Sequence, residues 1–301
     1  MLQRIPSTRY VSLGQSTTLS LKRHHATTRS SPTGSRIAPS SSPPPPITNA
    51  LAPTLANPSR TPIVLIHCGS FNPLTYLHLR TFELATDHAR TQTDYEVVGR
   101  IISPVSDAYG KKGLLEAKHR SGMCRRAVEE LYGRGGASHP GDVPVSLDLW
   151  EAAQTEYTPT ARVLDRFDRE INAASGGVGT AEGERRSVGI RLLGGADLLE
   201  SLKPPAWSEE DIEHILRRYG VWAVERQGAD VEDALERLKQ YRGRIEVIEQ
   251  NVLNDISSTK IRSMIERGLS IRHLVPDAVW KYIRAERLYQ DQARPRASKK
   301  T

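Results

Sequence analysis

Apolar and polar positions alternate along this chain in blocks that predict strands followed by helices. The first continuous apolar run, Ile63–Ile66 in TPIVLIHC, is typical of a strand buried on both faces of a parallel sheet. Pro73 is expected in the first turn of the next helix. The apolar face of that helix is expected to consist of Leu74, Leu77, Leu79, Phe82, Leu84 and Ala85.

The alternation continues to about residue 290. Five further strands are predicted in YEVVGRIISPV, VPVSLDLW, VGIRLLGG, YGVWAVER and RIEVIEQ. Helices are predicted in LLEAKHRSGMCRRAVEELYG, TPTARVLDRFDREIN, STKIRSMIERG and VPDAVWKYIRAERLY. Strands that alternate with helices favour an α/β fold with a doubly wound parallel sheet.

Three segments fall outside this pattern. Residues 1–60 are rich in Ser and Pro and carry few apolar residues, which predicts a disordered leader before a folded domain at 61–290. Residues 291–301 are expected to form a disordered basic tail. The polar, Gly-rich segment 172–187 is expected to be a flexible loop, because it contains no G-x-G-x-x-G and no strand leads directly into it.

The positive charge of the chain lies in its leader. The net charge is +7, yet residues 61–301 hold equal numbers of basic and acidic residues, 35 of each. The body therefore gives no electrostatic reason to expect nucleic-acid binding. The acid-free, Arg- and Ser-rich leader fits a mitochondrial transit peptide, and it equally fits an extension without targeting value on a nuclear or cytoplasmic protein. A shortened chain of residues 61–301 is expected to be soluble and active.

Cysteine content and hydropathy limit the compartment further. Cys68 and Cys124 are the only cysteines, too few for a disulfide framework, which favours a reducing intracellular compartment. No apolar run approaches the roughly 18–20 residues of a membrane-spanning helix. The sequence predicts no membrane insertion.

Polar or aromatic residues follow each of the six predicted strands. The segments are GSFNP, SPVSDAYGKKG, DLWEAAQTEYTPT, GGADLLESLKPPAW, VERQG and NDISSTKIR. Ligands of open parallel sheets bind beyond the carboxyl ends of the strands. Six such segments at one edge therefore predict a binding site there.

Two of these segments have features suited to phosphate. CGSFNPLTYLHLR offers backbone N–H groups at Gly69 and Ser70, and a Thr75–His78 pair at the start of a helix. SSTKIR places hydroxyl residues at a helix N-terminus, where unpaired N–H groups and the helix dipole attract anions, and it adds the cations of Lys260 and Arg262. The two helix starts can converge on one polyphosphate.

Each residue also has a simpler structural explanation. His78 can be a half-buried residue with one ordinary hydrogen bond, and Asp197 can simply cap a helix. Trp207 can belong to the core. Lys111 and Lys112 can form a solvated pair, and Tyr157, Thr160 and the ISSTKIR segment can be ordinary helix-start residues. These explanations weaken because all the pieces share one predicted edge.

The segments GSFNPLTYLHLRTFELA, ISPVSDAYGKKGL, GGADLLESL and NDISSTKIR…GLSIRHLVPDAVWKYI resemble those of eukaryotic nicotinamide mononucleotide adenylyltransferases. The resemblance covers roughly residues 61–290, in the same order. It implies the Rossmann-like fold of the nucleotidylyltransferase superfamily and the reaction of ATP with nicotinamide mononucleotide, or the nicotinic acid mononucleotide, to give NAD or deamido-NAD and pyrophosphate. It also implies Mg²⁺ as the divalent cation and a homo-oligomer.

The resemblance assigns roles to residues where the motifs align. Thr75 and His78 occupy the ends of the superfamily's (H/T)-x-x-H signature. The implied catalytic residues are His78, Lys111 and Arg262. The implied ATP-binding residues are Gly69, Ser70, Phe71, Thr75, His78, Asn254, Ser257, Thr259, Lys260, Ile261 and Arg262. The implied nicotinamide-nucleotide-binding residues are Gly69, Ser70, Lys111, Tyr157, Thr160, Gly195, Asp197, Trp207 and Arg226.

The chain departs from human-like family members at three points. Tyr157 stands where those members carry Trp, and Gly110 stands where they carry another Lys. The stretch between Asp197 and Trp207 is one residue shorter. No protein residue is implied as a metal ligand, so Mg²⁺ is expected on the ATP phosphates.

The residues themselves favour a reaction without a protein nucleophile. No Ser–His–Asp or Cys–His arrangement is evident and no P-loop is present, so catalysis is expected to rest on positioning and electrostatic stabilisation of pyrophosphate. One alternative is another nucleotidylyltransferase, for example one that activates a phosphorylated alcohol with CTP. Another is a nucleotide-binding, chaperone-like protein without significant turnover.

Overall fold

Six parallel strands form one sheet in the computed structural model, which describes residues 47–133, 143–225, 231–252 and 254–290. The order across the sheet is β3-β2-β1-β6-β7-β8. Successive strands are added to one side of β1 up to β3 and to the other side from β6 onward, so the strand order reverses between β1 and β6. In open α/β sheets, ligands bind at the carboxyl ends of the strands beside such a reversal. The strands are β1 (Thr61–Gly69), β2 (Tyr95–Pro104), β3 (Val145–Leu147), β6 (Gly189–Gly195), β7 (Val221–Val224) and β8 (Ile245–Ile248).

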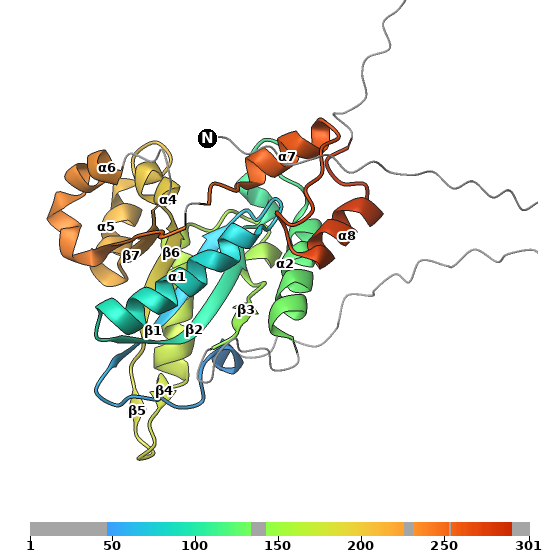
Figure 1. The fold of residues 1–301 in the computed structure, drawn as a ribbon. Coiled ribbons are helices and arrows are strands. Elements are labelled where there is room, and N and C mark those ends of the chain that lie inside the picture. Colours follow the sequence, from blue (N-terminus) through green and yellow to red (C-terminus); the bar gives the residue numbers. More distant parts are fainter. Residues whose placement is uncertain (1–46, 134–142, 226–230, 253, 291–301) are drawn as a thin grey trace, which may run out of the picture. The chain divides into compact units, whose positions relative to one another are not determined.

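Helices cover both faces of this sheet, and β1 contributes fully buried residues to each face. Val64 and Ile66 belong to one apolar cluster, whereas Ile63 and Leu65 belong to the other. The first cluster includes residues of α3 (Thr160–Asp168), α4 (Ala196–Ser201), α5 (Glu209–Arg218) and α6 (Val231–Arg237). The second includes residues of α1 (Tyr76–Gln92), α2 (Ala117–Tyr132), α7 (Ser258–Glu266) and α8 (Asp277–Ala285) (Figure 1). The predicted doubly wound parallel sheet is confirmed.

The turn between β1 and α1 differs from the prediction for Pro73. Helix α1 begins at Tyr76, and the peptide bond between Asn72 and Pro73 is cis. Pro73 therefore belongs to the turn before the helix and not to its first residues. Phe71 has a φ of 44°, in the left-handed region, which reverses the chain directly after β1.

The segment 172–187 is structured, in contrast to the flexible loop that its composition predicted. It begins within a π-helix (Arg169–Ala174) and continues into the antiparallel hairpin of β4 (Val178–Gly179) and β5 (Arg185–Arg186). Val178 is 2% exposed and packs in the core, which anchors the hairpin. No helix within the described ranges is long and apolar enough to cross a membrane.

Residues 47–60, here called the N-terminal strap, pack on the folded domain. Ile47 and Leu55 are 8% and 2% exposed and belong to the same core cluster as Val98 and Phe167. Leu51 lies against Gly99 of β2, where an added Cβ would approach its Cδ2 to 2.7 Å. The strap begins with a 3-10 helix, Ile47–Ala50.

Hydrogen bonds fix the strap along its length. The carboxylate of Glu96 accepts the backbone N–H groups of Ala56 and Asn57, at 2.7 and 2.8 Å. The N–H of Leu55 donates to Gly179 of the hairpin at 2.8 Å. The predicted leader boundary at residue 60 is therefore wrong, since apolar contacts and hydrogen bonds dock residues 47–60 on the domain.

Candidate active site

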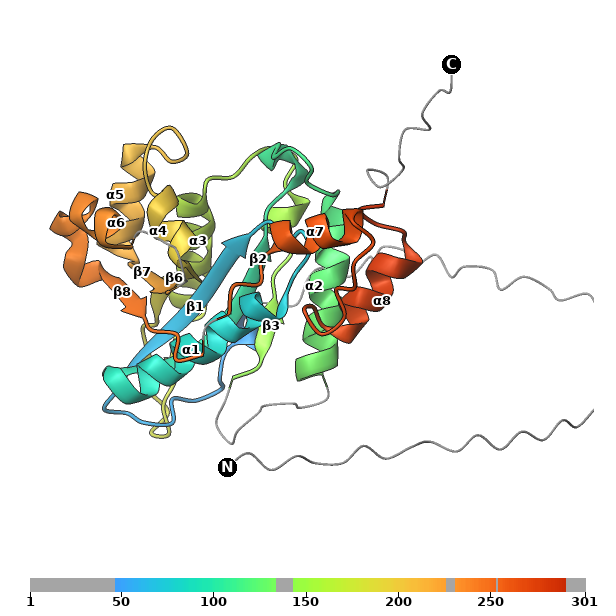
Figure 2. The ribbon, with the colours of Figure 1, turned by 45° about the horizontal axis from the view of Figure 1, so that its top comes forward.

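The loop after β1 and the N-terminus of α7 are joined by side chains. The Ser258 hydroxyl donates to the Pro73 carbonyl at 2.8 Å, and Arg262 Nη1 donates to the Asn72 carbonyl at 2.8 Å. The Tyr289 hydroxyl donates to Asn72 Oδ1 at the same distance. The structure thus brings together the two helix starts that the sequence predicted to converge, and Figure 2 shows α7 beyond the end of β1.

His78 is held in a defined orientation by Thr75. The Thr75 backbone N–H donates to His78 Nδ1 at 3.0 Å, and the Thr75 hydroxyl lies 2.8 Å from the same nitrogen. Because Nδ1 accepts a backbone proton, the neutral ring carries its own proton on Nε2. His78 is therefore prepared to donate through Nε2, as a stabiliser of phosphate oxygens must.

Two rings pack beneath His78. The centroid of Phe71 lies 5.3 Å from those of His67 and His78, with edge-to-face geometry. Burial, followed by the nearby charge of His78, lowers the pKa of His67 to about 3. His67 therefore stays neutral at physiological pH and contributes no charge beneath the predicted phosphate site.

The start of α7 has the geometry of an anion site. Ser257 caps the helix by accepting the Lys260 N–H at 3.2 Å. The first N–H groups, of Ser258 and Thr259, have no acceptor within the helix. Arg262 Nη2 donates to Thr259 Oγ1 at 3.3 Å, which holds the guanidinium along this end. Donors and a positive dipole therefore face the same region as the loop after β1.

The flanks of this helix start are also bonded. Asn254 Oδ1 accepts the Ile256 N–H at 3.0 Å. The ammonium of Lys260 pairs with Asp255. Binding of a polyphosphate by Lys260 would have to compete with this exposed pair.

The predicted nicotinamide side is built from residues after β3 and β6. Tyr157, 51% exposed, stacks on Tyr109 with ring centroids 5.9 Å apart. Gly195 is the N-cap of α4, and the exposed Asp197 follows in its first turn. Thr160 is the first residue of α3.

Trp207 is half-buried between α4 and α5. Its indole N–H donates to the Ser201 hydroxyl at 3.2 Å, and its ring packs against the core cluster. The ring is thus partly core and partly available at the strand-end edge. Lys111 is exposed in the loop after β2, and Arg226 lies outside the described residues.

A pocket of about 560 Å³ borders the nicotinamide side. Tyr157 is the only predicted site residue in its lining, which also includes Trp150, Arg162 and Arg169. The pocket is therefore a neighbour of the predicted site and does not contain the phosphate-binding elements.

Three predicted ATP-binding residues have buried side chains. Thr75 is fully buried and bonds to His78, so its observed role is to orient that ring. Phe71 and Ile261, each 1% exposed, belong to the core beneath the site. The Ile261 N–H donates to Ser257 within the helix, so neither its side chain nor its N–H faces a nucleotide.

Sequence reasoning missed the buried polar groups that support the site. Arg120, with a fully buried side chain, donates to the carbonyls of Ser70 and Leu115 at 3.3 and 2.7 Å and pairs with Asp107 at 3.0 Å. It thereby fixes the loop after β1 to the loop after β2. A buried Arg within a charged helix carries no periodic signal that could have revealed it.

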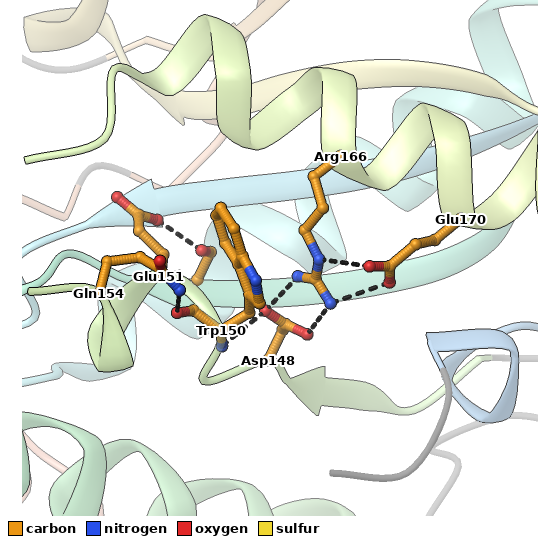
Figure 3. A network of polar contacts seen from close by, with 7 residues as sticks. Asp148, Trp150, Glu151, Gln154, Arg166 and Glu170 are labelled. Carbon is orange, nitrogen blue, oxygen red and sulfur yellow. Dashed lines mark hydrogen bonds and ion pairs between the residues drawn. The ribbon is translucent and has the colours of Figure 1, made fainter. Parts of the chain in front are cut away.

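A second buried group lies after β3. Glu151, on the 3-10 helix η3 (Glu151–Ala153), is 2% exposed and accepts the Ser103 hydroxyl at 2.5 Å. Figure 3 shows it on one side of Trp150, with Arg166 on the other. Arg166 is held by Asp148 at 2.6 Å and by Glu170 at 2.8 Å.

Comparison with known proteins agrees with this geometry. The cytidylyltransferase-like family matches residues 66–139. The chain is similar to nicotinamide/nicotinic acid mononucleotide adenylyltransferase 2 of Saccharomyces cerevisiae, with 44% identity over 80% of this chain and 60% of the yeast protein. It is also similar to nicotinamide/nicotinic acid mononucleotide adenylyltransferase 1 of Bos taurus, with 36% identity over 80% of this chain and 94% of the bovine protein.

A solved structure shares the fold. Plasmodium falciparum nicotinic acid mononucleotide adenylyltransferase, complexed with APC, superposes with a TM-score of 0.54 at 18% identity, over 76% of this chain and 98% of the other. The chain spans about three fifths of the length of the yeast relative. The identity to the bovine protein over nearly all of its length decides the assignment. This chain belongs to the nicotinamide/nicotinic acid mononucleotide adenylyltransferase family.

Proposed function

We propose that this protein transfers the adenylyl group of ATP to nicotinamide mononucleotide and to nicotinic acid mononucleotide. The products are NAD or deamido-NAD, and pyrophosphate. The proposal rests on one observation. Ser258 and Arg262 at the start of α7 are hydrogen-bonded to the loop that leads into the Thr75–His78 pair. Family membership supports the same reaction.

The reaction needs no protein nucleophile. A phosphate oxygen of the mononucleotide attacks the α-phosphorus of ATP, and the bond from that phosphorus to the bridging oxygen of pyrophosphate breaks. Negative charge develops on the departing pyrophosphate, where His78 Nε2–H, the α7 N–H groups and Arg262 can donate. Fixed donors of this kind stabilise a transition state without reorganisation.

We propose Mg²⁺ as the divalent cation. It would neutralise part of the charge on the ATP phosphates. The donors gathered at the proposed phosphate site are hydroxyl, N–H and guanidinium groups, which suit phosphate oxygens, and among the described residues no group of three His, Cys, Asp or Glu side chains could hold a metal. The ion is therefore assigned to ATP phosphates and water.

Incubation of the purified full chain with ATP, MgCl₂ and each mononucleotide tests the function. We expect NAD or deamido-NAD with equimolar pyrophosphate, separated by chromatography. An arm with CTP and a phosphorylated alcohol tests the alternative nucleotidylyltransferase. Binding without product in every arm would contradict the enzymatic proposal and favour a chaperone-like protein.

Two predictions from the sequence remain open. A homo-oligomer is tested by light scattering of the full chain, which would give a mass that is a multiple of 33.4 kDa. We propose a mitochondrial location on the composition of the leader, with the nucleus and cytoplasm as the alternative.

A further inference from the structure

Glu151 is a buried carboxyl group that the proposed reaction does not use. It is 2% exposed, and within the described part of the chain the Ser103 hydroxyl is its only hydrogen-bond partner. Ser103 is the last residue but one of β2 and pairs in register with Cys68, the last residue but one of β1. Glu151 therefore lies under the edge of the sheet where the nucleotides are proposed to bind.

Among the described residues, no cation is bonded to this carboxyl group. Arg120, whose charge lowers the pKa of Glu151, is bonded elsewhere. Its guanidinium donates to two backbone carbonyls and to Asp107. Arg166 is paired with Asp148 and Glu170, on the far side of Trp150 (Figure 3). A buried carboxylate without a paired cation is costly.

The protonation of Glu151 changes near neutral pH. Burial is the main cause that raises its pKa to about 7, and the charge of Asp148 adds to it, whereas the Ser103 hydrogen bond and Arg120 act in the opposite direction. Below this pH the side chain is neutral, and above it the side chain carries a negative charge. The ordinary pKa of Glu, about 4.3, would leave it charged throughout.

Glu151 precedes Tyr157 by six residues, in the segment between β3 and α3, and its charge is one of the smaller influences on the pKa of Tyr157. Burial and the neighbouring Tyr109 raise the pKa of Tyr157, and Asp211, Glu151 and Cys68 add smaller contributions. Tyr157 is one of the residues proposed to contact the pyridine nucleotide. The titrating groups and charges around Glu151 are Asp148, Arg120, Cys68 and Tyr157.

The two proposed acceptor nucleotides differ at the pyridine by one charge. Nicotinic acid mononucleotide carries a carboxylate that stays ionised at neutral pH, whereas nicotinamide mononucleotide carries a neutral amide. We propose that Glu151 is a specificity-determining residue whose charge disfavours the carboxylate-bearing nucleotide relative to the amide-bearing one. This inference rests on the proposed function, because it names a property of the same site.

The ratio of the two kcat/KM values, acid over amide, measures this property directly. Effects of pH on the shared ribose phosphate, on ATP and on stability cancel in the ratio. We expect the ratio to fall by about tenfold between pH 6 and pH 8.5, as expected for two charges several Å apart at partial burial. Its midpoint should lie near pH 7.

Two variants and one control sharpen the test. In Glu151→Gln the ratio should become independent of pH and should exceed the wild-type ratio at pH 8.5. In Ser103→Ala the midpoint should move to higher pH, because the hydrogen bond that favours the charged form is lost. Glu156→Gln, at an exposed carboxylate in the same segment, should keep the wild-type profile.

The outcomes separate this inference from the proposed function. Formation of both dinucleotides with a ratio that does not change with pH in the wild type would overturn the role of Glu151 and leave the function standing. A profile in Glu151→Gln equal to that of the wild type would overturn it too. If neither dinucleotide forms, the proposed function fails, and this inference fails with it. The wild-type and Ser103→Ala profiles decide the matter even if Glu151→Gln does not fold.

Discussion

Leu55→Ala is expected to destabilise the folded domain, although residue 55 lies in a segment whose composition predicts disorder. Leu55 is 2% exposed, and its truncation leaves a cavity in the core beneath the strap. Large-to-small changes at such sites cost about 2–5 kcal/mol of unfolding free energy. Because the strap precedes the first strand of the sheet and can detach from the domain, we expect a value near the lower end, about 2 kcal/mol.

The strap sets an upper limit on this loss. If the mutation releases the strap entirely, the remaining domain is equivalent to the chain of residues 61–301. Leu55→Ala therefore cannot cost more than removal of residues 1–60, apart from any strain in the docked state. The chain of residues 47–301, which retains the strap, should unfold at the same temperature as the full chain.

Thermal and urea unfolding of the full chain, Leu55→Ala, residues 61–301, residues 47–301 and a surface control measure these differences. A loss of about 2 kcal/mol lowers Tm by roughly 4–8 °C in a domain of this size. Val252→Ala, at a side chain that is 78% exposed, is the matched control and should change Tm by less than about 2 °C, in line with the roughly 0.5 kcal/mol limit for surface changes. Equal Tm values for residues 61–301 and 47–301 would refute the reasoning and restore the boundary at residue 60.

Three further predictions concern the site and the leader. His78→Ala should lower kcat by about a hundredfold while the circular dichroism spectrum is kept, and a nearly normal kcat would exclude His78 from transition-state stabilisation. Trp207→Ala should raise KM for the pyridine nucleotide several-fold and more than KM for ATP, because a cationic ring stacked on Trp gains roughly 0.5–2 kcal/mol; equal effects would show that Trp207 serves only the core. Residues 1–60 fused to a fluorescent reporter should direct it to mitochondria, and a reporter diffuse in cytosol and nucleus would exclude a transit peptide.

The sequence predicted the sheet because a buried parallel strand leaves a local signal. Ile63–Ile66 and VGIRLLGG are apolar without interruption, and both lie at the centre of the observed sheet as β1 and β6. The rule that ligands bind at the carboxyl ends of such strands then placed His78 and Arg262 near one edge. Neither inference needed knowledge of side-chain packing.

The packing of the strap was not predicted, because composition is averaged over a long segment whereas a few individual apolar side chains anchor the strap in the core. Ile47, Leu51 and Leu55 dock a short segment that follows a Ser- and Pro-rich stretch, SSPTGSRIAPSSSPPPP, whose composition dominates the leader as a whole. Their contact is specific, since Leu51 fits against Gly99, a position where any side chain would collide with it. Complementarity between residues 48 positions apart leaves no trace in local periodicity.

The role of Thr75 shows a different limit of motif reading. The (H/T)-x-x-H resemblance assigned both Thr75 and His78 to ATP, since both occupy the signature. In the structure Thr75 is fully buried, and its backbone N–H and hydroxyl both meet His78 Nδ1. Within this motif, Thr75 therefore sets the tautomer of His78, and only His78 can donate to phosphate. A substitution Thr75→Val would keep the backbone N–H donor and remove the hydroxyl, so the tautomer should survive while the ring loses one of its two restraints.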